Sequence, residues 1–144
     1  MSETLSIGQV AERTGLSVHA LRFYEREGLF ANPVRRDSGG RRVFSEDDVG
    51  WLTLCTLLRA SGMPLPEIRR YTELVREGDG NWPHRIELLR AQEQRVLAQM
   101  RQLEKSLDLI RFKLGVYADL MNGEHPAETV DNDATAVGER SPQP

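Results

Sequence analysis

A long heptad repeat in the second half of the chain constrains the fold more than any other feature. Between Trp82 and Met121, residues on one helical face recur at alternating steps of three and four, and ten of these eleven residues are apolar. They are Ile86, Leu89, Glu93, Val96, Met100, Leu103, Leu107, Ile110, Leu114, Tyr117 and Met121. The repeat predicts one α-helix, roughly 55–60 Å long, that packs against another helix in a coiled coil.

The residues before this helix are too few to cover so long an apolar stripe. We therefore expect its partner to be the same helix of a second copy of the chain, in preference to a fold-back onto its own domain. Antiparallel pairing about Leu103 would bring Ile86 close to Met121 of the second copy, and Glu93 close to Lys113. The opposite charges of Glu93 and Lys113 favour this register. The predicted dimerisation residues are Ile86, Leu89, Val96, Met100, Leu103, Leu107, Ile110, Leu114 and Tyr117.

The composition indicates a mainly helical protein of the cytoplasm. Aromatic residues make up 6% of the chain and charged residues 28%, which is unlike a β-sandwich or barrel. The start, "MSETLSIGQV", lacks the features of a signal peptide, and no apolar run is long enough to cross a membrane. The only cysteine, Cys55, cannot form an intrachain disulfide, and a cysteine-based metal site would need ligands from elsewhere.

Two short helices are predicted near the amino terminus. Ser6 and Gln9 fit a capping box, and the helix "IGQVAERT" ends at Gly15, which can adopt the left-handed conformation. Ser17 then begins a second helix. Two helices joined by the turn "TGLS" form a helix-turn-helix candidate.

A basic hairpin and two further helices are predicted next. The segment "VRRDSGGRRVF" fits two strands around the glycine-rich tip 37–40, with a pair of arginines on each side. Ser45 and Asp48 predict the start of a third helix, "EDDVGWLTLCTLLRAS". Pro64 and Pro66 stand where a fourth helix, "LPEIRRYTELVRE", has its first turn.

A basic region coexists with an acidic total. The formal net charge is −3, but residues 122–144 carry −4, which leaves +1 for residues 1–121. Between Arg13 and Arg42, seven arginines face three carboxylates, a local charge of +4. Because salt confines the field of exposed charges to their neighbourhood, this region can bind an anionic polymer in spite of the total.

The second helix and the hairpin carry the residues expected to bind DNA. The second helix of a helix-turn-helix presents its first residues to base edges in the major groove. Arginine can hold a guanine or a phosphate, and a basic hairpin suits backbone or minor-groove contact. In the structural alternative, Phe23 belongs to the core and the arginines are only solvated. The predicted DNA-binding residues are Ser17, His19, Arg22, Phe23, Tyr24, Arg36, Arg41, Arg42 and Arg59.

Other classes of function fit fewer of these features. An enzyme finds little support, since the chain has one cysteine, three scattered histidines and no glycine-rich phosphate loop. A coiled-coil adaptor explains the heptads but gives the basic hairpin no role. An architectural DNA-binding protein without an effector shares every feature, and only a ligand-dependent change in transcription separates it from a regulatory switch.

These motifs, in this order, resemble the mercury-resistance-type (MerR) family of transcription regulators. The similar segments are "IGQVAERTGLSVHALRFYEREGL", "GGRRVFSEDDV" and "GMPLPEI", and the resemblance spans about Leu5 to Met121. It implies a winged helix-turn-helix over 1–78 and an antiparallel coiled-coil dimer through 82–121. It also implies binding to an inverted repeat in a promoter spacer and a switch that works by distorting the DNA, so that RNA polymerase meets correctly aligned promoter elements.

The resemblance also assigns residues. It places Ser17 to Tyr24 on the recognition helix, and Arg36, Arg42 and Phe44 on the wing, which adds Phe44 to the predicted DNA-binding set. Phe23 and Phe44 stand where tyrosines are common in the family, so each lacks a hydroxyl that could bind phosphate.

The effector is less constrained. Metal-sensing relatives carry cysteines where this chain has "GNWPHRIE" and "NGEHPAE", so no metal or cofactor is expected. The segments "HRIELL" and "LDLIRFKLGVY" resemble the subgroup that responds to aldehyde or thiol-reactive stress, with Cys55 as the candidate sensor. However, Cys55 stands among core residues, where a cysteine is usually inert. His84 with His125 of a second copy could form an imidazole site, although solvated surface is the favoured interpretation.

The last segment, 122–144, has no periodicity and few apolar residues. We predict that it is a disordered acidic tail.

Overall fold

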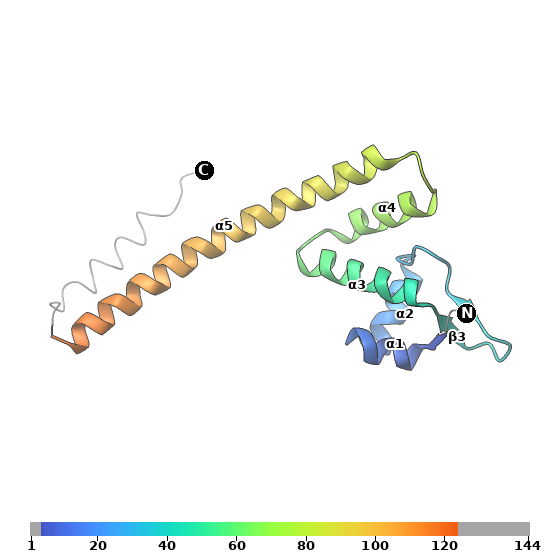
Figure 1. Cartoon of the computed structure of the whole chain (residues 1–144), viewed down its shortest axis with the longest axis horizontal. Helices are drawn as coiled ribbons and strands as arrows, with labels where there is room; N and C mark the ends of the chain where they lie inside the picture. Colours follow the sequence, from blue (N-terminus) through green and yellow to red (C-terminus); the bar gives the residue numbers. More distant parts are fainter. Residues whose placement is uncertain (1–3, 124–144) are drawn as a thin grey trace. The chain divides into compact units, whose positions relative to one another are not determined.

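The computed structural model describes residues 4–123 (Figure 1). In chain order its elements are β1 (Leu5–Ser6), α1 (Ile7–Thr14), α2 (Val18–Arg26), β2 (Arg35–Arg36), β3 (Arg42–Phe44), α3 (Glu46–Ala60), α4 (Leu65–Arg76) and α5 (Trp82–Met121). The chain divides into two compact units, one up to Val96 and one from Leu97 onward. We call the described part of the first, residues 4–96, the head unit. The predicted tail lies outside the described residues from position 124 onward, His125 included.

The predicted helix-turn-helix is present as α1 and α2. In the capping box of α1, the Ser6 Oγ accepts from the Gln9 N–H at 3.2 Å and the Gln9 Oε1 accepts from the Ser6 N–H at 2.8 Å. Gly15 ends α1 with a φ of 75°, in the left-handed region that favours glycine. The Ser17 Oγ then accepts from the Ala20 N–H at 3.0 Å and begins α2. Local capping chemistry therefore fixes the position of the turn.

A small antiparallel sheet with strand order β1-β3-β2 packs against α1 through β1 and β3. Arg35 pairs with Val43 in the predicted hairpin, and the Asp37 Oδ1 accepts from two backbone N–H groups at its tip. The sequence predicted two strands, and the structure adds a third, in which Leu5 pairs with Phe44. This strand is only two residues long and runs directly into the α1 cap, so it has no alternating pattern to detect.

The third and fourth predicted helices are α3 and α4. α3 begins with a second capping box, in which the buried Asp48 accepts from the Ser45 N–H at 2.9 Å. α4 begins after Pro64, with Pro66 in its first turn as expected. Along the chain in Figure 1, α3 and α4 connect the helix-turn-helix to α5.

One apolar core holds these elements together. It draws on every element of the head unit except the hairpin strand β2 and the start of α5, which only packs against it through Leu88. The buried core residues are Leu5, Val10, Leu21, Tyr24, Leu29, Phe30, Phe44, Leu52, Cys55, Met63 and Ile68. Each large side chain of this kind contributes about 1.5–3 kcal/mol when it leaves water.

The first turns of α5 are attached to the head unit by polar contacts. The Arg85 guanidinium binds carbonyl oxygens at the end of α4. The buried Gln92 donates to the Ser61 carbonyl at 3.0 Å, and Arg95 pairs with Glu67 at 2.8 Å. These contacts belong to the compact unit that reaches Val96, so the first turns of α5 are part of the head unit.

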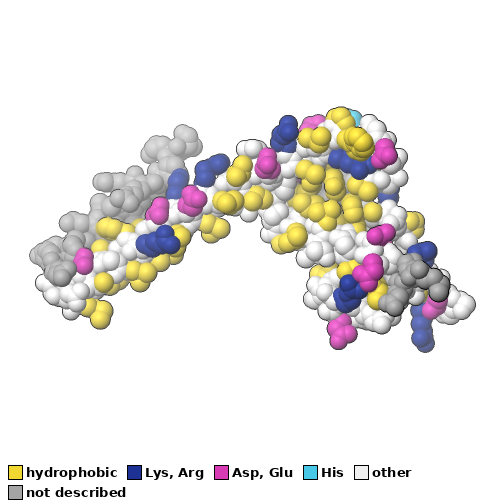
Figure 2. All heavy atoms as spheres, viewed as in Figure 1, with side chains coloured by type: hydrophobic (Ala, Val, Ile, Leu, Met, Phe, Trp, Pro, Cys, Tyr) yellow, Lys and Arg dark blue, Asp and Glu magenta, His cyan; other side chains and the backbone are white. Residues whose placement is uncertain are grey.

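The predicted long helix is continuous over Trp82–Met121, and its apolar stripe is exposed. Leu103 is 68% exposed, Leu114 63% and Met121 88%. Figure 2 shows hydrophobic side chains along α5. None of the described helices is long and apolar enough to cross a membrane.

Candidate nucleic-acid interface

The exposed side of α2 is polar and basic. His19 and Arg22 are exposed, as is Arg26 one turn further on, while Leu21 and Tyr24 face the core. Ser17 is exposed too, but its hydroxyl already accepts the capping hydrogen bond from Ala20. Of the predicted recognition residues, Ser17 therefore caps the helix, His19 and Arg22 form its basic surface, and Tyr24 packs against the core.

The two aromatic residues of α2 form a small cluster with an arginine of α3. The rings of Phe23 and Tyr24 meet edge to face, with centroids 6.0 Å apart. The Arg59 guanidinium carbon lies 5.0 Å from the Phe23 centroid and 6.0 Å from that of Tyr24. Stacking on aromatic faces restrains a guanidinium without using its N–H donors. Arg59 is exposed and lies beside the recognition helix.

The wing carries four arginines, and they differ in their partners. Arg41 is exposed at the tip, and Arg36 donates to the Gly40 carbonyl at 2.9 Å. Arg42 is partly buried in an ion pair with Glu25 of α2, which ties the wing to the recognition helix and offsets the charge of Arg42. Arg35 is exposed beside Arg36 and was not singled out. Its signal, a second arginine in the same pair, was present in the sequence.

Phe44 occupies a different place from the one the resemblance suggested. It lies in the core at 2% exposure, where its ring packs against Phe30 with centroids 5.8 Å apart. Phe44 is the direct antiparallel partner of Leu5 in β1, so the two side chains lie on the same face of the sheet, which packs into the core. We therefore assign Phe44 a packing role. Tyr24 is also a core residue, at 3% exposure.

An ion pair joins the helix-turn-helix to the start of α3. Arg13 at the end of α1 binds both carboxylate oxygens of Glu46, at 2.5 and 2.9 Å. This hydrogen bonding lowers the pKa of Glu46 and raises that of Arg13. The pair is exposed, so its contribution to stability is small, and it takes one arginine out of the basic surface.

Cys55, the candidate sensor, is fully buried. Its Sγ lies 3.8 Å from the Leu29 carbonyl oxygen, and burial raises the pKa of the thiol to about 11. A protonated, inaccessible thiol is a poor nucleophile. The geometry agrees with the packing interpretation.

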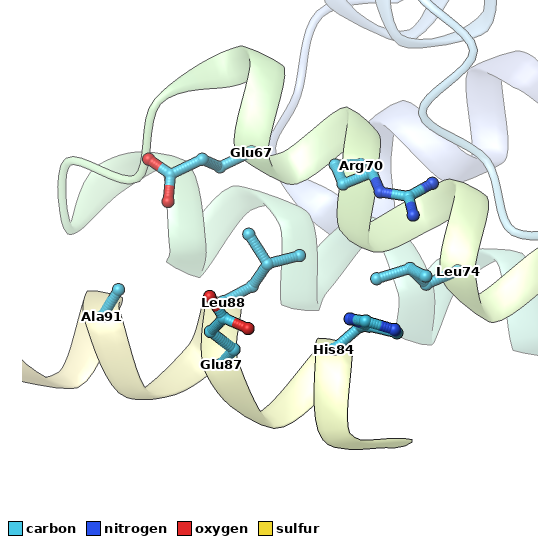
Figure 3. Close-up of a pocket in the computed structure, with 7 residues that line it drawn as sticks. All are labelled: Glu67, Arg70, Leu74, His84, Glu87, Leu88 and Ala91. Atoms are coloured by element: carbon cyan, nitrogen blue, oxygen red, sulfur yellow. The ribbon is translucent and has the colours of Figure 1, made fainter. Parts of the chain in front are cut away.

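His84 lines a cavity of about 280 Å³ between α4 and the start of α5. Figure 3 shows its imidazole near Leu74, with Arg70 and Glu67 also on α4 and Glu87 on α5, the helix that carries His84. Within residues 4–123 there is no group of three or more histidine, cysteine or acidic residues able to hold a metal ion.

The geometry defines a class of protein. A capped helix pair, an exposed basic second helix and an arginine-rich wing joined to it by an ion pair form a winged helix-turn-helix, a fold of DNA-binding regulators.

Comparison with known proteins identifies the family. The family model for the MerR HTH family regulatory protein matches residues 5–74. An uncharacterized HTH-type transcriptional regulator of Haemophilus influenzae is 39% identical over 114 residues, which cover 79% of this chain and 84% of that protein. This chain belongs to the MerR family, which confirms the resemblance read from the motifs.

Two solved structures are similar over most of the chain. HiNmlR, a MerR family regulator that lacks the sensor domain and was solved bound to promoter DNA, is 37% identical with a TM-score of 0.75, over 83% of this chain and 90% of that one. A MerR family transcriptional regulator from Bacillus thuringiensis is 33% identical with a TM-score of 0.70, over 80% of this chain and all of that one.

Proposed function

We propose that this chain is a dimeric, sequence-specific transcriptional regulator of the cytoplasm that binds an inverted repeat in a promoter spacer. The observation that carries the proposal is the basic surface shared by α2 and the wing, in a head unit that continues into a helix with an exposed apolar stripe. Family membership supports it, and the similar HiNmlR structure was solved on promoter DNA.

Different exposed residues are positioned for different parts of the DNA. His19 and Arg22 are positioned for base edges or phosphates of the major groove. The wing arginines, Arg36 and Arg41 above all, are positioned for the neighbouring backbone, where charge contributes affinity without reading sequence. Arg59, restrained against Phe23, extends the same surface.

The second part of the proposal is the homodimer. α5 carries an exposed apolar stripe, and an isolated helix would leave side chains such as Leu103 and Leu114 in water. Antiparallel pairing of two α5 helices would cover them and place one head unit at each end, so that two recognition helices meet two half-sites.

Regulation would work through the shape of the DNA. A promoter whose −35 and −10 elements are too far apart is a poor template, and a bound dimer that kinks or untwists the spacer would realign the elements for RNA polymerase. An effector would drive this change by binding one conformation of the dimer more tightly than the other. The buried thiol of Cys55 does not favour a thiol-reactive effector.

The test is selection of genomic fragments by the purified full-length protein, followed by footprinting of the bound sites. We expect dyad-symmetric sites between promoter elements that are set too far apart. Asymmetric sites outside promoters would favour an architectural DNA-binding protein, and the absence of enrichment would overturn DNA binding altogether. If an Arg22→Met variant selects the same fragments equally well, the proposal that α2 contacts the DNA through Arg22 is wrong.

A further inference from the structure

The chain leaves the recognition helix through a turn that several hydrogen bonds stabilise. We call residues 27–30 the post-recognition turn. Gly28 has a φ of 67°, and the Leu29 N–H donates to the Tyr24 carbonyl at 2.9 Å, which closes a Schellman motif at the end of α2. Leu29 and Phe30 are buried directly after it. The turn therefore fixes the direction in which the chain departs toward the wing.

Side chains from α3 and α4 bind three backbone carbonyls of this turn. Arg69 Nε donates to the Glu27 oxygen at 3.2 Å, and Trp51 Nε1 donates to the Leu29 oxygen at 2.6 Å. Arg76 donates to the Phe30 oxygen through Nε at 2.8 Å and through a second guanidinium nitrogen. Hydrogen bonds from charged donors are the stronger ones, and the two arginines supply such bonds to two of these three carbonyls.

Two of the three donors, Arg69 and Trp51, are themselves held in place. The second contact of Arg69 is an ion pair with the Glu27 carboxylate at 2.5 Å. The Trp51 ring stacks on Tyr71 of α4, with centroids 5.9 Å apart and planes 4° from parallel. A Cβ added at Gly28 would lie 3.8 Å from an Arg76 guanidinium nitrogen, so Arg76 reaches along the turn as well as to its end.

These arginines therefore have a different role from the exposed arginines of α2 and the wing. Arg69 and Arg76 lie seven residues apart on one face of α4 and point their donors at the protein's own backbone. Arg70, between them, instead meets only acidic side chains of its own helix and its end, at 3.5 and 3.8 Å.

The carboxyl end of α4, which carries Arg76, is also attached to α5. Asn81 donates to the Leu74 carbonyl at 2.8 Å, and Arg85 of α5 donates to the Leu74 and Gly78 carbonyls at 3.1 and 2.5 Å. The carboxyl end of α4 therefore contacts the start of α5 through Leu74 and Gly78, and the turn after the recognition helix through Arg76.

We propose that Arg69 and Arg76 are positioning residues for DNA recognition, which hold α2 and the wing at the angle needed to read both parts of a half-site. The inference rests on the proposed DNA-binding function. The ligand is one DNA half-site, which offers its base edges to α2 and the adjoining phosphates to the wing. Loss of either arginine should loosen the link between the two contacts without removing a DNA contact.

The experiment compares full-length variants on the operator found by genomic selection and on a scrambled duplex of equal length. Binding is measured by fluorescence anisotropy at several salt concentrations, with thermal unfolding of each variant. The test variants are Arg69→Met and Arg76→Met, which keep a long apolar stem. Arg70→Met is the matched control on the same helix, and Arg22→Met is the reference for a lost DNA contact. Trp51→Phe, which keeps the stacking on Tyr71, is the milder variant should Arg76→Met not fold.

We expect Arg76→Met to weaken operator binding about tenfold, the effect of one charge-assisted hydrogen bond. Binding to the scrambled duplex and the slope of affinity against salt should stay at wild-type values, and Arg70→Met should match wild type throughout. Trp51→Phe should move in the same direction by a smaller factor. Hydroxyl-radical footprints on the saturated operator should keep the protection under α2 and under the wing, because no DNA contact is removed.

Three outcomes would overturn the inference. Equal weakening on both duplexes with a shallower salt slope, by about 0.9 per lost contact, would make Arg76 a phosphate ligand. Reduced thermal stability with an unchanged ratio of operator to scrambled binding would make it purely structural. If the wild-type protein shows no preference for the operator, the proposed function is refuted, and the inference with it. This outcome is visible in the wild-type protein alone, so it cannot be confused with failure of the inference.

Discussion

At the scale of single residues, Cys55 shows how burial decides chemistry. The thiol sits in the core against the Leu29 carbonyl, and burial raises its pKa to about 11. At pH 8 about one molecule in a thousand would then carry the thiolate in the folded state. A role in thiol-reactive sensing would require the head unit to open first, because the reactive form is both scarce and covered.

The raised pKa has a consequence for stability that can be measured. The unfolded thiol ionises near its ordinary pKa of 9.0, whereas the folded thiol keeps its proton up to about pH 11. Between these values the unfolded state alone gains charge, so rising pH should lower the free energy of unfolding by about 1.4 kcal/mol per pH unit through this group. Below the unfolded value the effect should vanish.

Urea unfolding of wild type and Cys55→Ala, followed from about pH 7.5 to pH 10, isolates the contribution of this thiol. Wild type should lose stability relative to the variant only toward the alkaline end of this range. A constant difference between the two proteins, or rapid alkylation of the folded protein near pH 8, would mean that Cys55 is accessible after all and would restore it as a sensor candidate.

At the scale of elements, two glycines provide a matched test of what sets the helix-turn-helix. Gly15 ends α1 with a φ of 75°, and Gly50 lies on the exposed side of α3 with open space where a Cβ would be. Gly15→Ala should destabilise the head unit by about 1 kcal/mol because alanine resists the left-handed conformation, whereas Gly50→Ala should stabilise it by about 0.5–1 kcal/mol. Thermal or urea unfolding measures both, and equal effects of one sign would contradict the role of Gly15.

The elements also show which parts of the fold were readable from the sequence. Caps at Ser6, Ser17 and Ser45 and the heptad period of α5 are local signals, and they predicted the helices well. The strand at Leu5–Ser6 was missed because it forms by pairing with β3, a contact that two residues of sequence do not reveal.

The candidate site was readable to a smaller extent. Charge and position singled out His19, Arg22 and the wing arginines, which the structure leaves on the surface, apart from the paired Arg42. Phe44 is buried beside Leu5 of the distant strand β1. Arg69 and Arg76 bind carbonyl oxygens that lie 42 and 46 residues earlier in the chain. No periodicity or motif in the sequence reports such contacts.

At the scale of the whole molecule, the register of the dimer can be tested by exchanging charges. In the proposed antiparallel pairing, Glu93 lies near Lys113 of the second copy at two equivalent places. Lys113→Glu alone should raise the dimer dissociation constant roughly five- to thirtyfold, since two exposed pairs contribute about 0.5–1 kcal/mol each. The double variant Glu93→Lys, Lys113→Glu should recover most of the loss.

Sedimentation equilibrium of wild type, both single variants and the double variant measures this coupling. Glu87→Lys, an exposed charge of α5 outside the stripe, controls for net charge. If the double variant is as weak as the sum of the single ones, Glu93 and Lys113 do not meet, and a different register or a parallel coil is indicated.

The exposed stripe of α5 has a consequence in genetics. The residues that would pair two copies lie on α5, whereas those that would read DNA lie on α2 and the wing, so a copy with a damaged recognition helix keeps everything it needs to pair. In a cell that makes both forms, such copies would draw intact chains into dimers with one competent head, and an inverted repeat requires two. Alleles that alter Arg22 should therefore be dominant over wild type. Alleles that break the stripe, such as a charge at Leu103, should be recessive, because their products no longer reach a partner.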